Sequence, residues 1–209
     1  KKYTGSFGTG CFSFFPTKNI TTSEGGMLTT NSKKKYVQIK KMIAHGISKS
    51  KKKHFWNREA DLPGHNYRLP NHLAALGISQ LNNLTKFNKK RLTIAKIYNN
   101  FFEKFTDVFT TQKVNNNLTH SYQMYSILLK SKYRNNLLYH LKKYKIEASV
   151  HFDPPLHLQN YLKKYRKKLK NTEKLSKEII TLPIYPKLNR NELNRILNSI
   201  KNWYKKNKK

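Results

Sequence analysis

Hydrophobic residues near the start of the chain form two short runs with a polar segment between them. The first run, Cys11–Phe15, predicts a short buried strand that ends at Pro16, because proline cannot donate to a sheet ladder. The second, Met27–Thr30, follows Gly25-Gly26 and predicts another strand. Lys18 is therefore expected to lie on a stiff loop between two strands, which is a good way to aim an amine.

The next part of the chain has the spacing of amphipathic helices. Asn31-Ser32 resembles a helix N-cap, and the apolar stripe behind it stops at Gly46. We expect helices over residues 33–44, 71–84 and 85–105, with Thr85 as the N-cap of the third. The lysine-rich segment 48–63 has no such pattern and predicts an irregular loop.

The C-terminal half mixes the two patterns. Residues 107–118 predict a loop, and residues 120–129 predict a strand that is apolar, and hence buried, on both faces. A further strand is expected near residue 146, where it runs into a proline-rich turn, and another over 179–182. Helices are expected over 132–144 and 172–177, and a last one begins behind Asn189 as its N-cap.

Charge is the most unusual property of the composition. The 209 residues include 43 Lys+Arg against 10 Asp+Glu, a net charge of +33. Such an excess is typical of proteins that bind nucleic acid or another polyanion, so a basic nucleic-acid-binding protein is the alternative hypothesis. Lysine and asparagine are both abundant throughout, so a compositional bias of the whole sequence is a second explanation for the positive charge. The sequence contains no zinc-finger spacing, RNA-binding aromatic signature or Walker lysine.

Cysteine usage and hydropathy bear on the compartment. Cys11 is the single cysteine, which excludes an internal disulfide and favours a reducing compartment. No apolar run approaches membrane-spanning length, and no signal peptide is present. We therefore expect a cytoplasmic protein without a membrane partner.

The residues around Lys18 suit amine chemistry. A lysine attacks a carbonyl only when its amine is neutral, so such a site needs burial or a nearby cation to lower the pKa. Phe12, Phe14 and Phe15 are expected to give a dry setting. Taken alone, however, Lys18 is more simply one solvated lysine among many, and motifs further along the chain decide the question.

Ser13, Lys18 and Glu24-Gly25-Gly26 together resemble the signature of the DegT/DnrJ/StrS family of nucleotide-sugar aminotransferases. The resemblance implies that Lys18 carries pyridoxal 5'-phosphate as an internal aldimine and that Ser13 contacts the cofactor phosphate. Ser23 stands where the family usually has glycine, a change that alters the turn more than the chemistry.

A second match covers Gly64-His65-Asn66-Tyr67-Arg68 and the helix segment Ala74–Leu81, whose residues follow the family pattern Ala-Ala-x-Gly-x-x-Gln-Leu. In the family this asparagine reaches across a dimer interface to the cofactor phosphate of the partner subunit. The resemblance thus assigns Asn66 to cofactor binding and implies a homodimer with shared active sites. If this motif stood alone, a simple turn residue would be the favoured interpretation of Asn66.

A third match, Ile146–Gln159, resembles a family segment in which a strand runs into a loop at the mouth of the active site, near the sugar nucleotide. His151 and His157 are therefore candidates for substrate binding. His120, at a position where the family has a histidine at the start of the expected strand, is a weaker one. A structural role is as good an explanation for each histidine. Two histidines without a cysteine or carboxylate cluster do not indicate a metal site.

The family implies an α/β fold of the aspartate-aminotransferase-like type, fold type I, with a large cofactor domain and a small C-terminal α+β domain. Residues 1–105 are expected to be the C-terminal part of an incomplete large domain, and residues 106–209 the small domain. The implied reaction moves an amino group, usually from glutamate, onto a nucleotide-linked keto-sugar for amino-sugar or surface-polysaccharide biosynthesis. The ring-stacking aromatic and the pyridine-pairing aspartate are missing, so we expect this chain to be a fragment that is inactive alone.

Overall fold

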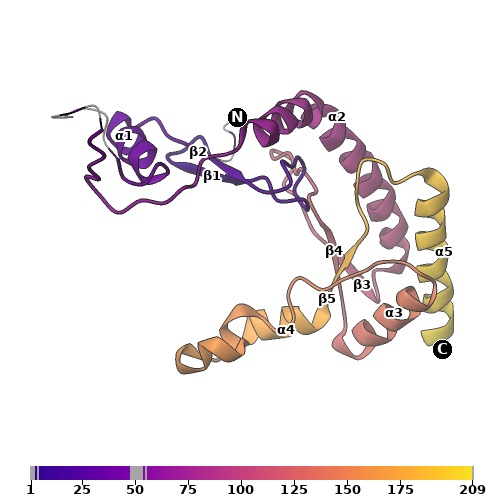
Figure 1. The fold of residues 1–209 in the computed structure, drawn as a ribbon. Coiled ribbons are helices and arrows are strands. Elements are labelled where there is room, and N and C mark those ends of the chain that lie inside the picture. The colour runs from indigo at the N-terminus through magenta and orange to yellow at the C-terminus, as the bar shows by residue number, and fades with distance from the viewer. Residues whose placement is uncertain (1–2, 4, 48–53, 55, 209) are drawn as a thin grey trace. The chain divides into compact units, whose positions relative to one another are not determined.

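The computed structural model describes residues 3, 5–47, 54 and 56–208, which belong to two compact units (Figure 1). The N-terminal unit is Lys1–Leu84 and the C-terminal unit is Thr85–Lys209. The boundary falls inside one long helix, α2 (Asn71–Phe102). The domain boundary expected near residue 105 concerns the complete family fold and stays a prediction.

The N-terminal unit begins with a two-stranded antiparallel sheet. Strand β1 (Gly10–Ser13) pairs with β2 (Gly26–Thr29), and Ser13 lies opposite Gly26. Both predicted strands are present, but β1 ends at Ser13, before the predicted end at Phe15. The expectation that the first strand is buried is wrong, because only Gly10 in it is buried. Within the described residues this sheet has no third strand, and a two-stranded ribbon shields little of its own surface.

Helix α1 (Lys33–Met42) begins where predicted. The Ser32 hydroxyl accepts a hydrogen bond from the Lys35 backbone N–H at 3.3 Å, which makes Ser32 the N-cap. The helix ends at Met42 instead of residue 44, because the chain turns away through His45 and Gly46, whose φ angles are 63° and 73°. The irregular loop expected over 48–63 lies partly outside the described residues.

Residues 71–102 form one helix where the sequence predicts two. Thr85 is not an N-cap, because it lies inside α2. The stretch Asn82-Asn83-Leu84 contains neither glycine nor proline, and the apolar spacing continues across it, so nothing ends the helical hydrogen bonding there. A short 3₁₀ turn, η1 (Glu103–Phe105), follows, and the helical region therefore ends at Phe105 as predicted.

A three-stranded antiparallel sheet organises the C-terminal unit. Its strand order is β3-β4-β5, with β3 at Phe109–Thr111, β4 at Tyr125–Leu129 and β5 at Ile179–Leu182. β5 is confirmed. β4 is shorter than predicted, because Tyr122 has a φ of 44°, which breaks the extended conformation. It is fully buried on one face only. β3 lies in the predicted loop, since three residues are too few to show an alternating pattern.

Three helices complete this unit (Figure 1): α3 (Ser131–Lys143), α4 (Lys170–Glu178) and α5 (Arg190–Asn207). Helix α3 packs against α5 and β5, and α4 packs against β4. Between α3 and α4 lie two 3₁₀ segments, η2 (Leu156–Leu158) and η3 (Asn160–Tyr165). The strand predicted near residue 146 is reduced to a single bridge between Ser149 and Thr181, because Pro154 and Pro155 soon end any pairing.

The hydrophobic core of the C-terminal unit is rich in aromatic rings. Trp203, Tyr98, Phe102 and Phe109 are among its largest fully buried side chains. The Tyr98 ring stacks on Tyr125 with centroids 4.7 Å apart, and its hydroxyl donates a 2.9 Å hydrogen bond to the Pro183 carbonyl. Burial raises the pKa of the Tyr98 hydroxyl, so the group stays a neutral donor in the core.

The N-cap predicted at Asn189 is present as a capping box. The Asn189 side chain accepts from the Glu192 N–H at 2.9 Å, and the Glu192 carboxylate accepts from the Asn189 N–H at 3.0 Å. We expect Asn189→Ala to lower the free energy of unfolding by about 1 kcal/mol in denaturant titrations. Asn191→Ala, at an exposed position two residues further on in the first turn of α5, is the control. Equal losses in the two variants would contradict a specific cap.

Candidate active site

The loop that carries Lys18 starts at the end of β1. The backbone of Phe15 links the two predicted site residues, Ser13 and Lys18. The Phe15 N–H lies 3.4 Å from the Ser13 hydroxyl oxygen, and the Phe15 carbonyl accepts from the Lys18 N–H at 3.0 Å. Lys18 is thus held in a tight turn directly behind Pro16, close in sequence to the strand end. The spacing of Ser13 and Lys18 therefore has a structural basis, because one hydrogen-bonded turn separates them.

Phe14 holds the two ends of this loop together through its backbone. Its N–H donates to the Gly25 carbonyl at 2.9 Å, and its carbonyl accepts from the Thr22 N–H at 3.0 Å and the Thr21 hydroxyl at 2.9 Å. Thr22 is 1% exposed, and its hydroxyl donates to the Glu24 carbonyl at 2.7 Å. Residues 14–25 therefore form a closed, internally bonded loop.

Glycines are required where this loop returns to β2. Gly25 has a φ of 136°, and a Cβ there would lie 2.7 Å from the Leu69 Cδ1. A Cβ on Gly26 would lie 2.7 Å from the Phe12 carbonyl oxygen. Ser23, which replaces the usual family glycine, has a φ of 70°, a conformation that costs a non-glycine residue about 1 kcal/mol.

Helix α2 approaches the same loop through a glycine. A Cβ on Gly77 would lie 2.9 Å from the Thr22 methyl group, so the helix backbone comes close to the buried Thr22. Gly77 belongs to the second family motif, and Thr22 lies between Lys18 and Glu24 of the first. The two motifs are therefore in contact. Glycine normally weakens the interior of a helix, and the close approach to Thr22 explains why one is present at position 77.

The side chain of Lys18 is half-buried, and within the residues that the structure describes it makes no hydrogen bond or ion pair. The dry aromatic setting expected for it is not present in these residues. Phe12 is 40% exposed and Phe15 46% exposed, because the two-stranded sheet leaves them uncovered, and only Phe14 is half-buried.

Asn66 is positioned by a tight crossing of two backbone segments. His45 N–H donates to the His65 carbonyl at 3.1 Å, and His65 and Tyr67 N–H donate to the carbonyls of Met42 and Ile43 at 2.8 and 3.1 Å. Asn66 forms an isolated bridge with Ala44 at the centre of this crossing. Its side chain is exposed, and its Oδ1 accepts from the Arg68 Nε at 3.1 Å.

The sequence profile of the DegT/DnrJ/EryC1/StrS aminotransferase family matches residues 1–201. The chain belongs to this family.

Among sequence relatives of this DegT-family chain, GDP-perosamine synthase of Escherichia coli O157:H7 is 34% identical over 97% of this chain and 54% of its own length. UDP-4-amino-4,6-dideoxy-N-acetyl-beta-L-altrosamine transaminase of Campylobacter jejuni subsp. jejuni serotype O:23/36 (strain 81-176) is 34% identical, over 85% of this chain and 47% of its own. Among solved structures, Helicobacter pylori PseC, an aminotransferase involved in the biosynthesis of pseudoaminic acid, superposes with a TM-score of 0.85 at 29% identity.

These matches confirm the expected α/β fold of the fold type I aminotransferases. The structural match to PseC covers 98% of this chain but 57% of PseC. The chain thus spans about half the length of the curated relatives it matches.

The three candidate histidines of this DegT-family chain all lie in the C-terminal unit, and each is engaged there. His120 Nδ1 accepts from the Tyr122 N–H at 3.0 Å. His151 Nδ1 lies 3.0 Å from the Thr181 hydroxyl. His157 Nε2 lies 3.3 Å from the Glu173 carboxylate. These contacts give each histidine a structural role in this unit, and a role in substrate binding stays a prediction.

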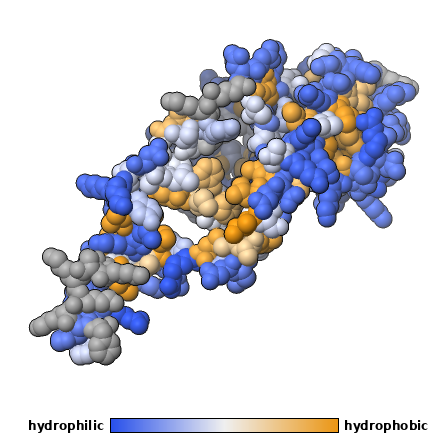
Figure 2. All heavy atoms as spheres, turned by 90° about the horizontal axis from the view of Figure 1, so that it is seen from above, coloured by the Kyte–Doolittle hydropathy of each residue, from blue (hydrophilic) through white to orange (hydrophobic). Residues whose placement is uncertain are grey.

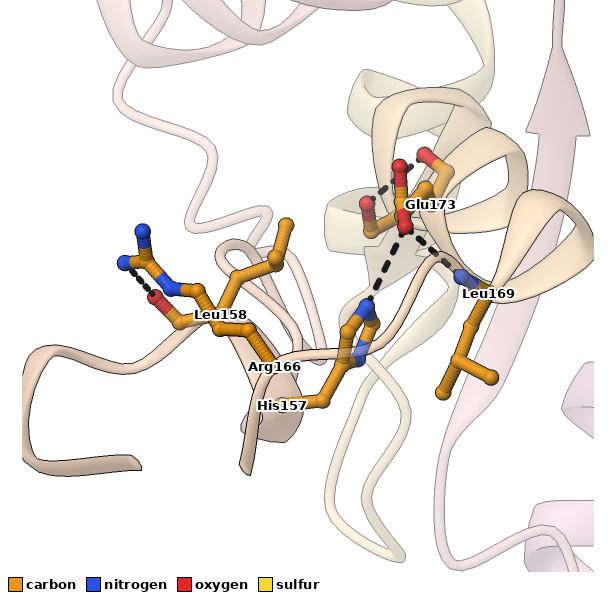
Figure 3. A network of polar contacts seen from close by, with 6 residues as sticks. His157, Leu158, Arg166, Leu169 and Glu173 are labelled. Atoms are coloured by element: carbon orange, nitrogen blue, oxygen red, sulfur yellow. Dashed lines mark hydrogen bonds and ion pairs between the residues drawn. The ribbon is translucent and has the colours of Figure 1, made fainter. Parts of the chain in front are cut away.

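Figure 3 shows how His157 is held. The Glu173 carboxylate accepts from the Leu169 N–H at 2.8 Å and also pairs with His157, while the Arg166 guanidinium donates to the Leu158 carbonyl at 3.1 Å. The Leu169 hydrogen bond and then His157 lower the pKa of Glu173 below its usual value. This network fixes the segment between η2 and α4.

Two buried arginines of the C-terminal unit are not predicted from the sequence as site residues. Arg91 donates through Nη1 to the carbonyls of Tyr122, Gln123 and Ile184, at 3.1, 3.2 and 2.7 Å. Arg134 pairs with Asp153. Their signal in the sequence is weak, because arginines are hard to single out in so basic a chain. Within the described ranges, no group of three or more His, Cys, Asp or Glu side chains is placed to hold a metal ion.

Proposed function

We propose that this protein is a pyridoxal 5'-phosphate-dependent aminotransferase that moves an amino group, from glutamate as donor, onto a nucleotide-linked keto-sugar. The observation that carries the proposal is the Lys18 loop: a half-buried lysine without a partner in the described residues, one turn beyond Ser13, in a loop closed on glycines. The family membership and the amino-sugar enzymes among the relatives support the reaction and the substrate class.

The residues of the loop fit the cofactor. When bound, pyridoxal phosphate supplies an electron sink that stabilises the negative charge formed at the carbon losing its proton. Lys18 would hold the cofactor covalently at rest and, once displaced by the amino donor, carry the proton between the cofactor and substrate carbons. The Ser13 hydroxyl oxygen faces the Phe15 N–H, so its own hydrogen remains available to donate to a phosphate oxygen.

Asn66 supports a shared site between two copies of the chain. Arg68 occupies its Oδ1, so the two hydrogens of the amide nitrogen remain to donate to a phosphate oxygen. Asn66 is exposed, as a residue that serves a partner subunit has to be. We propose a homodimer in which Asn66 of one subunit binds the cofactor phosphate held by Lys18 of the other.

We expect Asn66→Asp to weaken cofactor binding by about tenfold or more, because a carboxylate would repel the phosphate where the amide donates to it. Cofactor titration followed by absorbance measures the change. Asn82→Asp, an exposed position on α2, is the matched control for the added charge. An equal effect in the two variants would argue against a phosphate contact at Asn66.

Mixing subunits tests the sharing of the site. A dimer of one Lys18→Ala subunit and one Asn66→Asp subunit carries both defects in one site and none in the other. The test uses a cofactor concentration that saturates the unmodified protein but leaves Asn66→Asp largely empty, so that both variants are impaired. Activity that returns on mixing them supports the shared homodimer, and its failure to return contradicts it.

The attachment point is tested directly by borohydride, which fixes the cofactor to the amine that holds it. The protein is incubated with an equimolar amount of pyridoxal phosphate, reduced and mapped by mass spectrometry. We expect the label on the peptide that contains Lys18, and its loss in Lys18→Arg but not in Lys33→Arg. Labelling spread evenly over the lysines, unchanged in Lys18→Arg, would overturn the proposal.

The free thiol of Cys11 supports the reducing cytoplasm as the site of this reaction. Among the described residues, every helix is too short or too polar to cross a bilayer.

Within the part of the chain that the structure describes, nothing beyond the net charge favours the nucleic-acid alternative. Hydrophilic side chains are spread over the visible surface and interrupted by apolar patches (Figure 2). Lysines occupy the last turns of α1, α3 and α5, as Lys40-Lys41, Lys142-Lys143 and Lys205-Lys206. Cations at these positions face the negative ends of the helix dipoles, which is a structural reason for their placement. We therefore propose no second function on the net charge alone, and nucleic-acid binding stays the alternative hypothesis.

A further inference from the structure

Arg134 makes an unusual connection in the C-terminal unit. It lies on α3, is 7% exposed, and uses two different nitrogens of its guanidinium group. Nη2 pairs with the Asp153 carboxylate at 2.6 Å, and Nε donates to the Lys177 carbonyl at 3.1 Å. Lys177 lies in the last turn of α4, directly before β5. One buried side chain therefore joins α3, the α4–β5 junction and the loop that contains Asp153.

The same loop is attached to β5 on its other side. Ser149 and Thr181 exchange backbone hydrogen bonds of 3.0 and 2.8 Å, and the Thr181 hydroxyl lies 3.0 Å from His151 Nδ1. Thr181 is itself 7% exposed, and its hydroxyl also lies 3.3 Å from the Ser126 hydroxyl on β4. His151 thus stands between two fixed points, the bridge at Ser149 and the ion pair at Asp153.

This arrangement engages only one nitrogen of the imidazole. Nδ1 faces the hydroxyls of Thr181 and Ser149, at 3.0 and 3.4 Å. Among the described residues, Nε2 makes no hydrogen bond. A hydrogen bond at Nδ1 selects the tautomer and the ring orientation, and so decides whether Nε2 donates or accepts. A histidine held in this way can make a directed contact with a ligand.

We propose that Arg134 is a positioning residue: by tying Asp153 to the end of α4, it holds the His151 loop against β5, so that His151 presents Nε2 to the nucleotide-linked substrate. The part that concerns substrate rests on the function proposed above. Arginine suits the role because its planar group can serve a carboxylate and a carbonyl together, whereas a lysine ammonium is a single point of charge.

The ring orientation of His151 can be measured without any catalysis. In histidine side-chain ¹⁵N NMR of the full chain, a fixed neutral imidazole gives two well-separated nitrogen signals, and a ring that exchanges between tautomers gives signals that move together. We expect separated signals for His151 in the unmodified chain. Asp153→Asn and Arg134→Met should bring them together, and Arg134→Lys should give an intermediate separation.

Two controls keep this measurement specific. His140 Nε2 contacts the Ser199 carbonyl at 3.0 Å, in the packing of α3 on α5, so its signals should not change while the unit stays folded. Asp107→Asn removes a different ion pair, that with Lys208, and should leave His151 unaffected. Arg134→Met changes a buried side chain and so also perturbs the packing of the unit. The Asp153 side chain is 38% exposed, so Asp153→Asn tests the positioning role without a change in the core.

Kinetics of the complete enzyme give the second readout. We expect Asp153→Asn to raise KM for the nucleotide-linked sugar about tenfold with kcat changed less than about twofold, and to leave KM for the amino donor unchanged. Unchanged His151 signals in Asp153→Asn would overturn the positioning role. Changed signals without the KM effect would restrict Arg134 to a structural role and overturn the link to substrate. If the unmodified complete enzyme shows no amino transfer at all, the proposed function is contradicted. The NMR result would then still decide whether Arg134 positions His151.

Discussion

Replacing Lys18 with alanine is expected to lower the rate of amino transfer by at least about 10³-fold, because the residue that carries the proton between the reacting carbons is lost. The cofactor should still bind through its phosphate contacts, since Ser13 and Asn66 are untouched. Initial rates of the complete enzyme with saturating amino donor and nucleotide-linked sugar measure the effect. Lys33→Ala, an exposed lysine at the start of α1, should keep full activity.

Chemical rescue makes this prediction more specific. Small primary amines such as methylamine should restore part of the activity of Lys18→Ala, because they can take over the proton transfer in the space left by the side chain. Rescue should depend on the concentration of the neutral amine and should not affect the unmodified protein. A Lys18→Ala variant that retains normal activity would place the catalytic amine elsewhere.

The sequence predicts the Lys18 loop well because its signals are local. A run of apolar residues, a proline and two glycines are sufficient to place both strands and the turn. The contact that supports the loop from behind is not local. Gly77 approaches Thr22 from a helix that begins at residue 71, and no periodicity in either segment relates the two positions. The family pattern identifies Gly77 as a position of the motif, but it does not show that the glycine is needed for the approach to Thr22.

Helix ends show where capping signals are sufficient. Ser32 and Asn189 both have a free stretch of non-helical chain before them, and both cap. Thr85 has the right residue type, but helical chain lies on both sides of it, and propensity at one position cannot stop a helix that its neighbours continue. The same limit hides β3, whose three residues depend on pairing with β4 and not on their own pattern.

The histidines show the limit of an argument from family resemblance. The resemblance identifies His120, His151 and His157, but each one's partner comes from a distant part of the chain or from a backbone group. Thr181 and Glu173 carry no motif that points to a histidine. Hydrogen bonding of this kind depends on the tertiary structure, so the sequence could identify the residues but not what holds them.

Gly46→Ala is expected to destabilise the N-terminal unit by about 3 kcal/mol or more, through its backbone and not through any lost contact. Gly46 has a φ of 73°, and a Cβ there would lie 1.7 Å from the Leu62 carbonyl oxygen. Since that neighbour is backbone, relief requires the crossing of residues 42–46 with 62–67 to open. The crossing carries Asn66, so cofactor affinity should fall together with stability.

Hydrogen exchange locates this effect, because a chain of two compact units need not unfold in one step. The amides of His65 and Tyr67 donate to Met42 and Ile43 across the crossing, and we expect them to lose protection in Gly46→Ala while amides of the C-terminal unit keep theirs. Gly8→Ala is the matched control, since a Cβ at Gly8 meets no atom within 4 Å. If the two variants exchange alike, the crossing tolerates a side chain at Gly46, and the tight approach of these segments cannot be what positions Asn66.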